Sequence, residues 1–316
     1  MTGPYAITLG ETMALFRSSD VGSLRQTRDF ELGIGGAESN VAIGISRLGI
    51  EAHWIGRVGD DELGARVTRE LQAEGVVLHV AVDADADTGL MIKERVTSQH
   101  TRVTYRRRGS AGSRLRPFDI RPEWIAEAGL LHLSGITLGL SLTARDAFEH
   151  ALEIARTASV PVSFDVNHRS TIWNGLEAAD HYRRAAALST IVFAGAEEAA
   201  VLLAEELSPE DTVHALARLG PSEVVLKLGE HGCLALIDGD LHRVEAIPIA
   251  PLDSVGAGDA FVAGYLAERL AGEPAERRLA TAVRAGAMAC LSPGDWEGNP
   301  TRKSLGLLSS VDPVLR

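Results

Sequence analysis

Short apolar runs alternate with longer amphipathic stretches along most of the chain. The apolar runs predict buried strands, and the amphipathic stretches predict helices. The predicted strands cover residues 6–9, 53–58, 130–133, 160–165, 190–193 and 223–228. The predicted helices cover residues 39–48, 62–74, 143–158, 197–206, 211–219, 257–270 and 276–291. Because strands that alternate with helices pair in parallel, we expect one α/β domain over residues 1–316, a three-layer α/β/α sandwich with a mostly parallel central sheet.

Two regions depart from this alternation. Residues 76–108 contain successive strand-like runs separated by turns, and residues 11–32 lack a strong helical period. We expect these two regions to form a small accessory β-sheet. Such a sheet could lie as a lid over the carboxyl ends of the main strands, where open α/β sheets bind ligands. Ordinary hairpins at the sheet edge would give the same pattern, so that alternative stays open.

Composition and net charge exclude some classes of binding partner for this protein. The 316 residues carry a net charge of -12, which repels phosphate and therefore excludes a general affinity for nucleic acid or anionic membranes. The two cysteines, Cys233 and Cys290, lie far apart without metal-binding spacing. The amino-terminal residues do not resemble a secretory signal, and no apolar stretch is long enough to span a bilayer. We expect a cytoplasmic protein without nucleic-acid or membrane partners.

A glycine-rich element at residues 253–264 is the strongest chemical signal. Gly256, Ala257 and Gly258, which we call the glycine turn, precede a predicted helix. Unpaired N–H groups at a helix start can bind a phosphate, and small side chains let it approach the backbone. Asp259 follows in the first helical turn, where a carboxylate could accept the proton of an attacking hydroxyl. A helix cap with glycines for a tight turn is the structural alternative.

Three segments together carry a family resemblance. The run DSVGAGDAFVAGYL at 253–266 resembles the carboxyl-terminal signature of the ribokinase-like, phosphofructokinase-B family of sugar kinases. The runs GGAESNVA at 35–42 and GRVGDDELG at 56–64 resemble further segments of that family, in the family's order. The P-loop pattern GxxxxGK[ST] is absent from the sequence, and no complete GxGxxG pattern occurs at residues 33–38.

The resemblance implies a carbohydrate kinase that uses ATP and Mg2+. It implies that Asp259 takes the proton of the substrate hydroxyl while the glycine turn holds the transferring phosphoryl group. It also implies contacts between the sugar hydroxyls and Gly35, Gly36 and Asn40.

Arginines gather in one segment of this acidic chain. From Arg95 to Phe118, both included, the sequence has seven arginines and no acidic residue. Clustered guanidinium groups suit a carboxylate or a phosphate, which they bind through two parallel hydrogen bonds. A solvated hairpin with charged edges would have the same composition. We expect at least one arginine of residues 105–108 to face the substrate.

The substrate is indicated by two further resemblances. Residues 105–113 resemble the lid segment of 2-keto-3-deoxygluconate kinases, and this implies that Tyr105 and Arg107 hold a sugar acid. The run DVNHR at 165–169 resembles a segment whose arginine binds the substrate carboxylate, which implies that role for Arg169. The implied reaction converts 2-keto-3-deoxygluconate to its 6-phosphate.

Two departures keep alternatives open. Met91 stands where some such kinases have a tyrosine, and Arg106 stands where a second tyrosine is common. The substrate could therefore be a related sugar acid or a neutral sugar, as in a fructokinase. A non-catalytic sensor that binds nucleotide or sugar is a third hypothesis.

The nucleotide and metal contacts follow from the same resemblance. Lys227, Gly229 and Gly232 lie in a strand and turn that resemble the family's nucleotide-binding segment. Many members have an NxxE run near the metal-bound phosphates; here Gly195 replaces the asparagine, so only Glu198 corresponds. Mg2+ would be bound mainly through ATP phosphates and water. Family members often pair through their lids, so we also consider a homo-oligomer formed through the accessory sheet.

Overall fold

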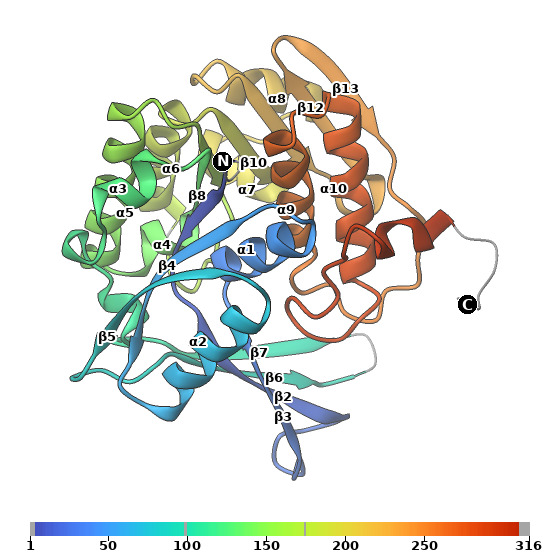
Figure 1. Cartoon of the computed structure of the whole chain (residues 1–316). Coiled ribbons are helices and arrows are strands. Elements are labelled where there is room, and N and C mark those ends of the chain that lie inside the picture. Colours follow the sequence, from blue (N-terminus) through green and yellow to red (C-terminus); the bar gives the residue numbers. More distant parts are fainter. Residues whose placement is uncertain (1–3, 98–99, 174, 310–316) are drawn as a thin grey trace.

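Helices cover both faces of a central sheet, and a smaller sheet projects from one end (Figure 1). The computed structural model describes residues 4–97, 100–173 and 175–309, so both ends of the predicted 1–316 domain lie outside the described residues. The predicted three-layer α/β/α sandwich is confirmed. Within the described ranges, no helix combines the length and apolarity needed to cross a membrane.

The central sheet is mostly parallel. Among the described residues it has nine strands, in the order β13-β12-β11-β10-β9-β8-β1-β4-β5. All neighbouring pairs are parallel except the two that join β11, β12 and β13. In that order the strands are Asp240–Val244, Cys233–Ile237, Glu223–Lys227, Ile191–Gly195, Val162–Asp165, Leu130–Ser134, Ala6–Leu9, Ala52–Gly59 and Val77–Asp83.

The small sheet is formed by β3 (Phe30–Gly35), β2 (Met13–Val21), β6 (Leu90–Arg95) and β7 (Thr101–Arg106), in that order. The prediction that residues 76–108 belong to this sheet is wrong for β5, which pairs in parallel with β4 of the central sheet. The physical reason is that β5 is a half-exposed edge strand, so its alternating pattern looks like that of a hairpin strand.

Two hydrophobic cores fill the spaces between the central sheet and its helical layers. One core includes side chains of α1, α2, α9 and α10, and the other includes side chains of α3 to α8. The helices, from α1 to α10, are Ala37–Arg47, Glu62–Ala73, Pro122–Ala126, Gly135–Leu140, Leu142–Thr157, Gly175–Ala187, Ala196–Leu203, Pro209–Ala217, Ala257–Leu270 and Ala275–Ala289.

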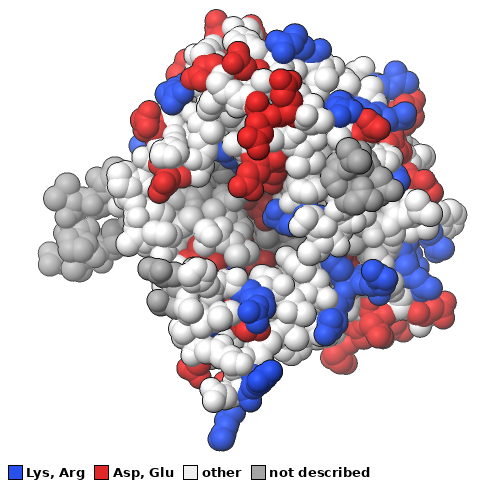
Figure 2. Space-filling view, turned by 180° about the vertical axis from the view of Figure 1, so that it is seen from behind, with Lys and Arg blue, Asp and Glu red and all other residues white. Residues whose placement is uncertain are grey.

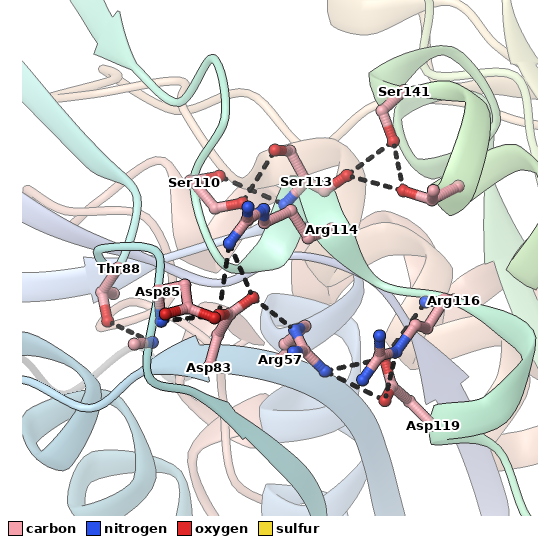
Figure 3. A network of polar contacts seen from close by, with 12 residues as sticks. Arg57, Asp83, Asp85, Thr88, Ser110, Ser113, Arg114, Arg116, Asp119 and Ser141 are labelled. Carbon is pink, nitrogen blue, oxygen red and sulfur yellow. Dashed lines mark hydrogen bonds and ion pairs between the residues drawn. The ribbon is translucent and has the colours of Figure 1, made fainter.

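A buried polar network fixes the segment after β7 to the edge of the central sheet (Figure 3). Arg57 on β4 donates to Asp83 on β5 and to Asp119, with N–O distances of 2.9 and 3.0 Å. Arg114 reaches the same Asp83 carboxylate. Removing one partner from such a buried cluster leaves an uncompensated charge, so the network holds the short helices η1 (Gly112–Arg114) and η2 (Pro117–Asp119) in place.

Candidate active site

The glycine turn has a backbone shape that requires glycine at its first position. Gly256 has a φ of +79°, in the left-handed region, and a Cβ there would collide with the backbone carbonyl of Asp295. Helix α9 begins at Ala257, whose own N–H donates to Ser254. The N–H groups of the next residues in the first helical turn are therefore the ones left for a ligand.

Asp259 is a buried carboxylate held by two amide side chains. Its Oδ2 accepts from Nδ2 of Asn40 at 2.8 Å, and its Oδ1 accepts from Nδ2 of Asn167 at 3.5 Å. Burial raises the pKa of Asp259 to about 7, with a smaller raising effect from the charge of Asp165 and a lowering one from the Asn40 hydrogen bond. A carboxylate with a pKa near neutrality is suited to accept a proton from an alcohol.

A first cavity of about 760 Å3 opens above Asp259, between the small sheet and the central sheet. Figure 2 shows a hollow across the middle of the face opposite to that of Figure 1, with acidic and basic side chains at its edge. The structure brings most of the predicted substrate residues to this cavity. Its lining includes Gly36, Asn40, Tyr105, Arg107, Arg169, Gly256 and Asp259. Gly35 lies buried at the end of β3, where a Cβ would collide with Met91 and Asp295.

The arginines around the first cavity differ in their partners. Arg107 contacts the buried carboxylate of Glu11 through both Nε and Nη2, at 2.7 and 2.6 Å. Its guanidinium also lies 5.7 Å from the ring centre of Tyr105. Arg169 is exposed and donates to the carbonyl of His168. Arg108 and Arg114 line the cavity too, so arginines gather around the first cavity, and contact between any of them and a substrate stays a prediction.

A second cavity of about 670 Å3 lies on the other side of the glycine turn. Its lining includes Ala257 and Gly258 of the glycine turn. It also includes Lys227, Gly229 and Gly232, the three residues of the segment that resembles the family's nucleotide-binding segment. Its remaining lining is largely apolar and comes mainly from residues 246–249 and 251 and from α9 and α10. Such a lining suits a flat heterocycle.

Lys227 lines the second cavity beside the glycine turn. Its Nζ lies 2.8 Å from Asp165 and 3.9 Å from Glu198. It also lies 3.7 Å from the position that a Cβ of Gly258 would take. Burial raises the pKa of Asp165 to about 6, while the Lys227 charge lowers it. The ammonium group is therefore close to any phosphate that the glycine turn would bind.

Glu198 occupies the first turn of α7, where its Oε2 accepts from the N–H of Gly195 at 2.6 Å. Within the described part of the chain, no group of His, Cys, Asp and Glu side chains forms a metal site. The carboxylates near Lys227 nevertheless suit Mg2+, which prefers oxygen ligands and usually keeps several waters and substrate phosphates.

Several polar residues of the site were not predicted, and three of them contact or adjoin the predicted residues. Glu11 neutralises Arg107 and also accepts from Ser110, Asn167 donates to Asp259, and Asp295 lines the first cavity. Asn167 could have been found, since it lies between Asp165 and Arg169 at the end of a predicted strand. Glu11 and Asp295 have no local signal, because their roles depend on contacts with distant segments.

The fold and the paired cavities define a carbohydrate kinase. The chain belongs to the pfkB family of carbohydrate kinases, whose sequence profile matches residues 4–302. It is 35% identical over 314 residues to 2-dehydro-3-deoxygluconokinase from Bacillus subtilis, a match that covers 97% of this chain and 95% of the relative. It is 33% identical to 2-dehydro-3-deoxygalactonokinase from Haloferax volcanii, with 92% of each chain covered.

Solved structures agree with this assignment. A PfkB protein from a Polaromonas species has a TM-score of 0.88 and 33% identity, and the match covers 96% of this chain and 99% of that one. A 2-dehydro-3-deoxygluconokinase from Thermotoga maritima has a TM-score of 0.90 over 97% of this chain and 98% of its own. At 24% identity, the second structure shows the likeness of fold alone.

Proposed function

We propose that this kinase transfers the terminal phosphoryl group of ATP to a hydroxyl of a small sugar acid, and that 2-keto-3-deoxygluconate, also called 2-dehydro-3-deoxygluconate, becomes its 6-phosphate. The supporting observation is the position of Asp259, at the floor of an arginine-lined cavity and beside a turn that borders a second cavity. The relatives named for 2-keto-3-deoxy sugar acids support the same substrate class.

In the proposed reaction the sugar acid lies in the first cavity. Arg169 binds its carboxylate, and Tyr105 and Arg107 hold oxygens at its other side. Asn40 keeps the Asp259 carboxylate oriented and contacts a sugar hydroxyl, beside the backbone of Gly35 and Gly36. The small sheet covers the cavity and excludes water, which limits wasteful hydrolysis of ATP.

ATP lies in the second cavity with its triphosphate at the glycine turn. The sugar oxygen forms a bond to the terminal phosphorus, the bond to the ADP oxygen breaks, and Asp259 takes the proton of the hydroxyl. The N–H groups of the turn and Lys227 stabilise the charge on the transferring group. Lys227, Gly229 and Gly232 border the nucleotide.

Asp165 and Glu198 would hold Mg2+, largely through water, and the ion would supply charge neutralisation on the phosphates. A putative ribokinase of Escherichia coli that shares the fold, with a TM-score of 0.90 and 24% identity, was solved with ATP and Mg2+. That complex supports the use of both by a protein of this fold.

One observation favours a neutral sugar as the second candidate. Glu11 contacts two nitrogens of Arg107, so this arginine offers less charge to a substrate carboxylate. A fructokinase from Klebsiella pneumoniae is 35% identical over 239 residues, which cover 74% of this chain and 76% of the relative. Arg169 is the residue proposed to bind the carboxylate, which a neutral sugar lacks. The effect of removing its side chain therefore distinguishes the two substrates.

The test compares Arg169→Ala with the unaltered enzyme on 2-keto-3-deoxygluconate and on fructose, in an assay that couples ADP release to NADH oxidation. Losing a charge-assisted contact of roughly 1.5–3 kcal/mol should lower kcat/KM for the acid about 10- to 100-fold and leave fructose turnover nearly unchanged. Arg184→Ala, an exposed arginine on α6, is the matched control. Equal losses on both sugars would contradict the carboxylate contact.

A further inference from the structure

The small sheet sends one buried ammonium group into the body of the protein. Lys93 on β6 is only 1% exposed, although both strands that flank β6 in the small sheet, β2 and β7, contain exposed residues. Its Nζ lies 2.6 Å from Asp253, 3.2 Å from Asp295 and 2.9 Å from the carbonyl oxygen of Gly294. An ammonium group has three donors, and here each has an acceptor, as a buried charge requires.

All three acceptors belong to segments that shape the glycine turn. Asp253 precedes the turn, and its Oδ1 accepts from the N–H of Val255 at 3.1 Å. The carbonyl oxygen of Asp295 occupies the place that a Cβ of Gly256 would take. The contacts of Lys93 therefore join the small sheet to both segments that hold the turn in shape.

The position of Lys93 on its strand connects it with the first cavity. Met91, two residues earlier on β6, lines that cavity, and alternate residues of a strand lie on the same face. Met91 is 4% exposed and Lys93 1% exposed. Residues 91 and 93 are about 7 Å apart along the strand. A sugar that contacts Met91 and fixes the position of β6 would therefore also fix the position of the Lys93 ammonium group.

The contact between the small sheet and the segments beside the glycine turn depends on charge, and therefore on the position of the Lys93 ammonium group. Burial raises the pKa of Asp295, the Lys93 charge lowers it, and Glu297 and Asp253 raise it. Withdrawal of the ammonium group would leave carboxylates facing each other without a cation, so the turn would lose its support. The contacts of Lys93 with Asp253 and Asp295 therefore depend on the position of β6.

We propose that Lys93 is a positioning residue that couples closure of the small sheet on the sugar to the shape of the phosphate-binding glycine turn. The inference rests on the proposed function, because it assigns the first cavity to the sugar and the turn to the phosphoryl group. Lys93 contacts neither substrate in this arrangement. It acts through Asp253 and Asp295, so that the turn is completed when the sugar is bound.

The experiment measures hydrogen exchange of the full chain with and without 2-keto-3-deoxygluconate, in the absence of ATP. In the unaltered enzyme the sugar acid should slow exchange in both the small sheet and residues 253–258. In Lys93→Ala it should slow exchange in the small sheet only. Lys303→Ala, which removes an exposed lysine, is the matched control and should behave like the unaltered enzyme.

Kinetics give the second readout. Lys93→Ala should lower kcat about 100-fold, the loss typical of a misplaced catalytic group, while KM for the sugar acid changes less than about threefold. Methylammonium, which can enter the vacated space and donate three hydrogen bonds, should restore part of kcat. Tetramethylammonium, which has no N–H donor, should not. A purely structural lysine would lower thermal stability without this difference between the two ions.

If Lys93→Ala does not fold, Lys93→Met/Asp253→Asn replaces it, because that variant removes the charge on both sides of the closest pair. Sugar-induced protection of residues 253–258 that persists in the folded variant overturns the coupling, as does a kcat close to that of the unaltered enzyme. If the unaltered enzyme neither binds nor phosphorylates the sugar acid, the proposed function is wrong. If the unaltered enzyme is active and the Lys93 variant behaves in the same way, the proposed function stands and only the coupling is wrong.

Discussion

Amide donors rather than a cation hold Asp259, and this arrangement sets its proton affinity. A guanidinium or ammonium group in direct contact would lower the pKa of the carboxyl and make it a weaker base. The nearby Lys227 instead bonds to Asp165. Asn40 and Asn167 fix the Asp259 carboxylate without supplying positive charge, so burial dominates and raises the pKa of Asp259 to about 7.

Replacing Asp259 by Asn should remove the proton acceptor and leave the cavity intact. We expect kcat to fall by about 100- to 10,000-fold, the usual contribution of a general base, with ATP affinity nearly unchanged. The coupled assay gives kcat, and isothermal titration calorimetry gives the ATP affinity. Glu153→Gln, an exposed carboxylate on α5, is the control. Near-normal turnover by Asp259→Asn would contradict the proposed base.

The rate should depend on pH through the same group. Because the base must be deprotonated, kcat/KM should decrease tenfold per pH unit below about pH 7, the pKa of Asp259 in the free enzyme. A profile that stays flat down to pH 5 would argue against Asp259 as the titrating base.

The stability contribution of Asp259 has the opposite dependence on pH. Its folded-state pKa of about 7 lies above the reference value of 3.8, so the folded chain keeps a proton that the unfolded chain loses between these values. The contribution is fully present below about pH 4 and is lost as the pH rises to about 7. Urea unfolding across this window should therefore show a smaller dependence on pH in Asp259→Asn than in the unaltered enzyme.

At the scale of elements, the sequence predicts the repeating strands and helices but not the strands at the sheet edges. The period of apolar residues locates β1, β4, β8, β9, β10 and β11, which are buried in the middle of the sheet. The strands toward the two edges are different: the edge strand β5 resembles a hairpin strand, and the edge strand β13 and its neighbour β12 were not predicted. Helix α6 was also missed, although its alternation of alanines and charged residues is a usable local signal.

The site residues also fall into two groups, those that the sequence predicts and those that it does not. The glycine turn and Asp259 lie next to each other in the sequence, so a local pattern predicts them. The contacts of Lys93 with Asp253 and Asp295 join residues about 160 to 200 positions apart, which no local pattern contains. A lone lysine within a strand gives no sign that its charge is buried.

The glycine turn provides a prediction at this scale. Gly256→Ala should destabilise the chain and lower kcat, because an L-residue at a φ of +79° costs about 1–2 kcal/mol and its Cβ would also displace the Asp295 backbone. Gly272→Ala is the matched control, since that glycine has a φ of +75° and open space around its Cβ position. Thermal unfolding and the coupled assay measure both effects. Equal losses in the two variants would show that backbone strain alone matters.

At the scale of the whole molecule, an acidic protein presents two separate cavities to negatively charged ligands. The net charge is -12, so attraction must come from local groups. The first cavity has arginines around it, and the second has Lys227 and the start of α9. The glycine turn lies between the two cavities: Gly256 lines the first cavity, and Ala257 and Gly258 line the second. This arrangement allows a sugar acid and ATP to be bound at the same time.

Simultaneous binding predicts additive stabilisation. In Asp259→Asn, which should bind both ligands without turnover, a ligand at 100 times its dissociation constant adds about 2.7 kcal/mol to the free energy of unfolding. Because the cavities are separate, 2-keto-3-deoxygluconate and ATP together should raise Tm by at least the sum of their individual shifts, measured by scanning calorimetry. Closure of the small sheet over both ligands would make the combined shift larger than the sum. A combined shift no larger than that of the tighter ligand would mean that the two compete for one cavity, and would contradict the assignment of the second cavity to ATP.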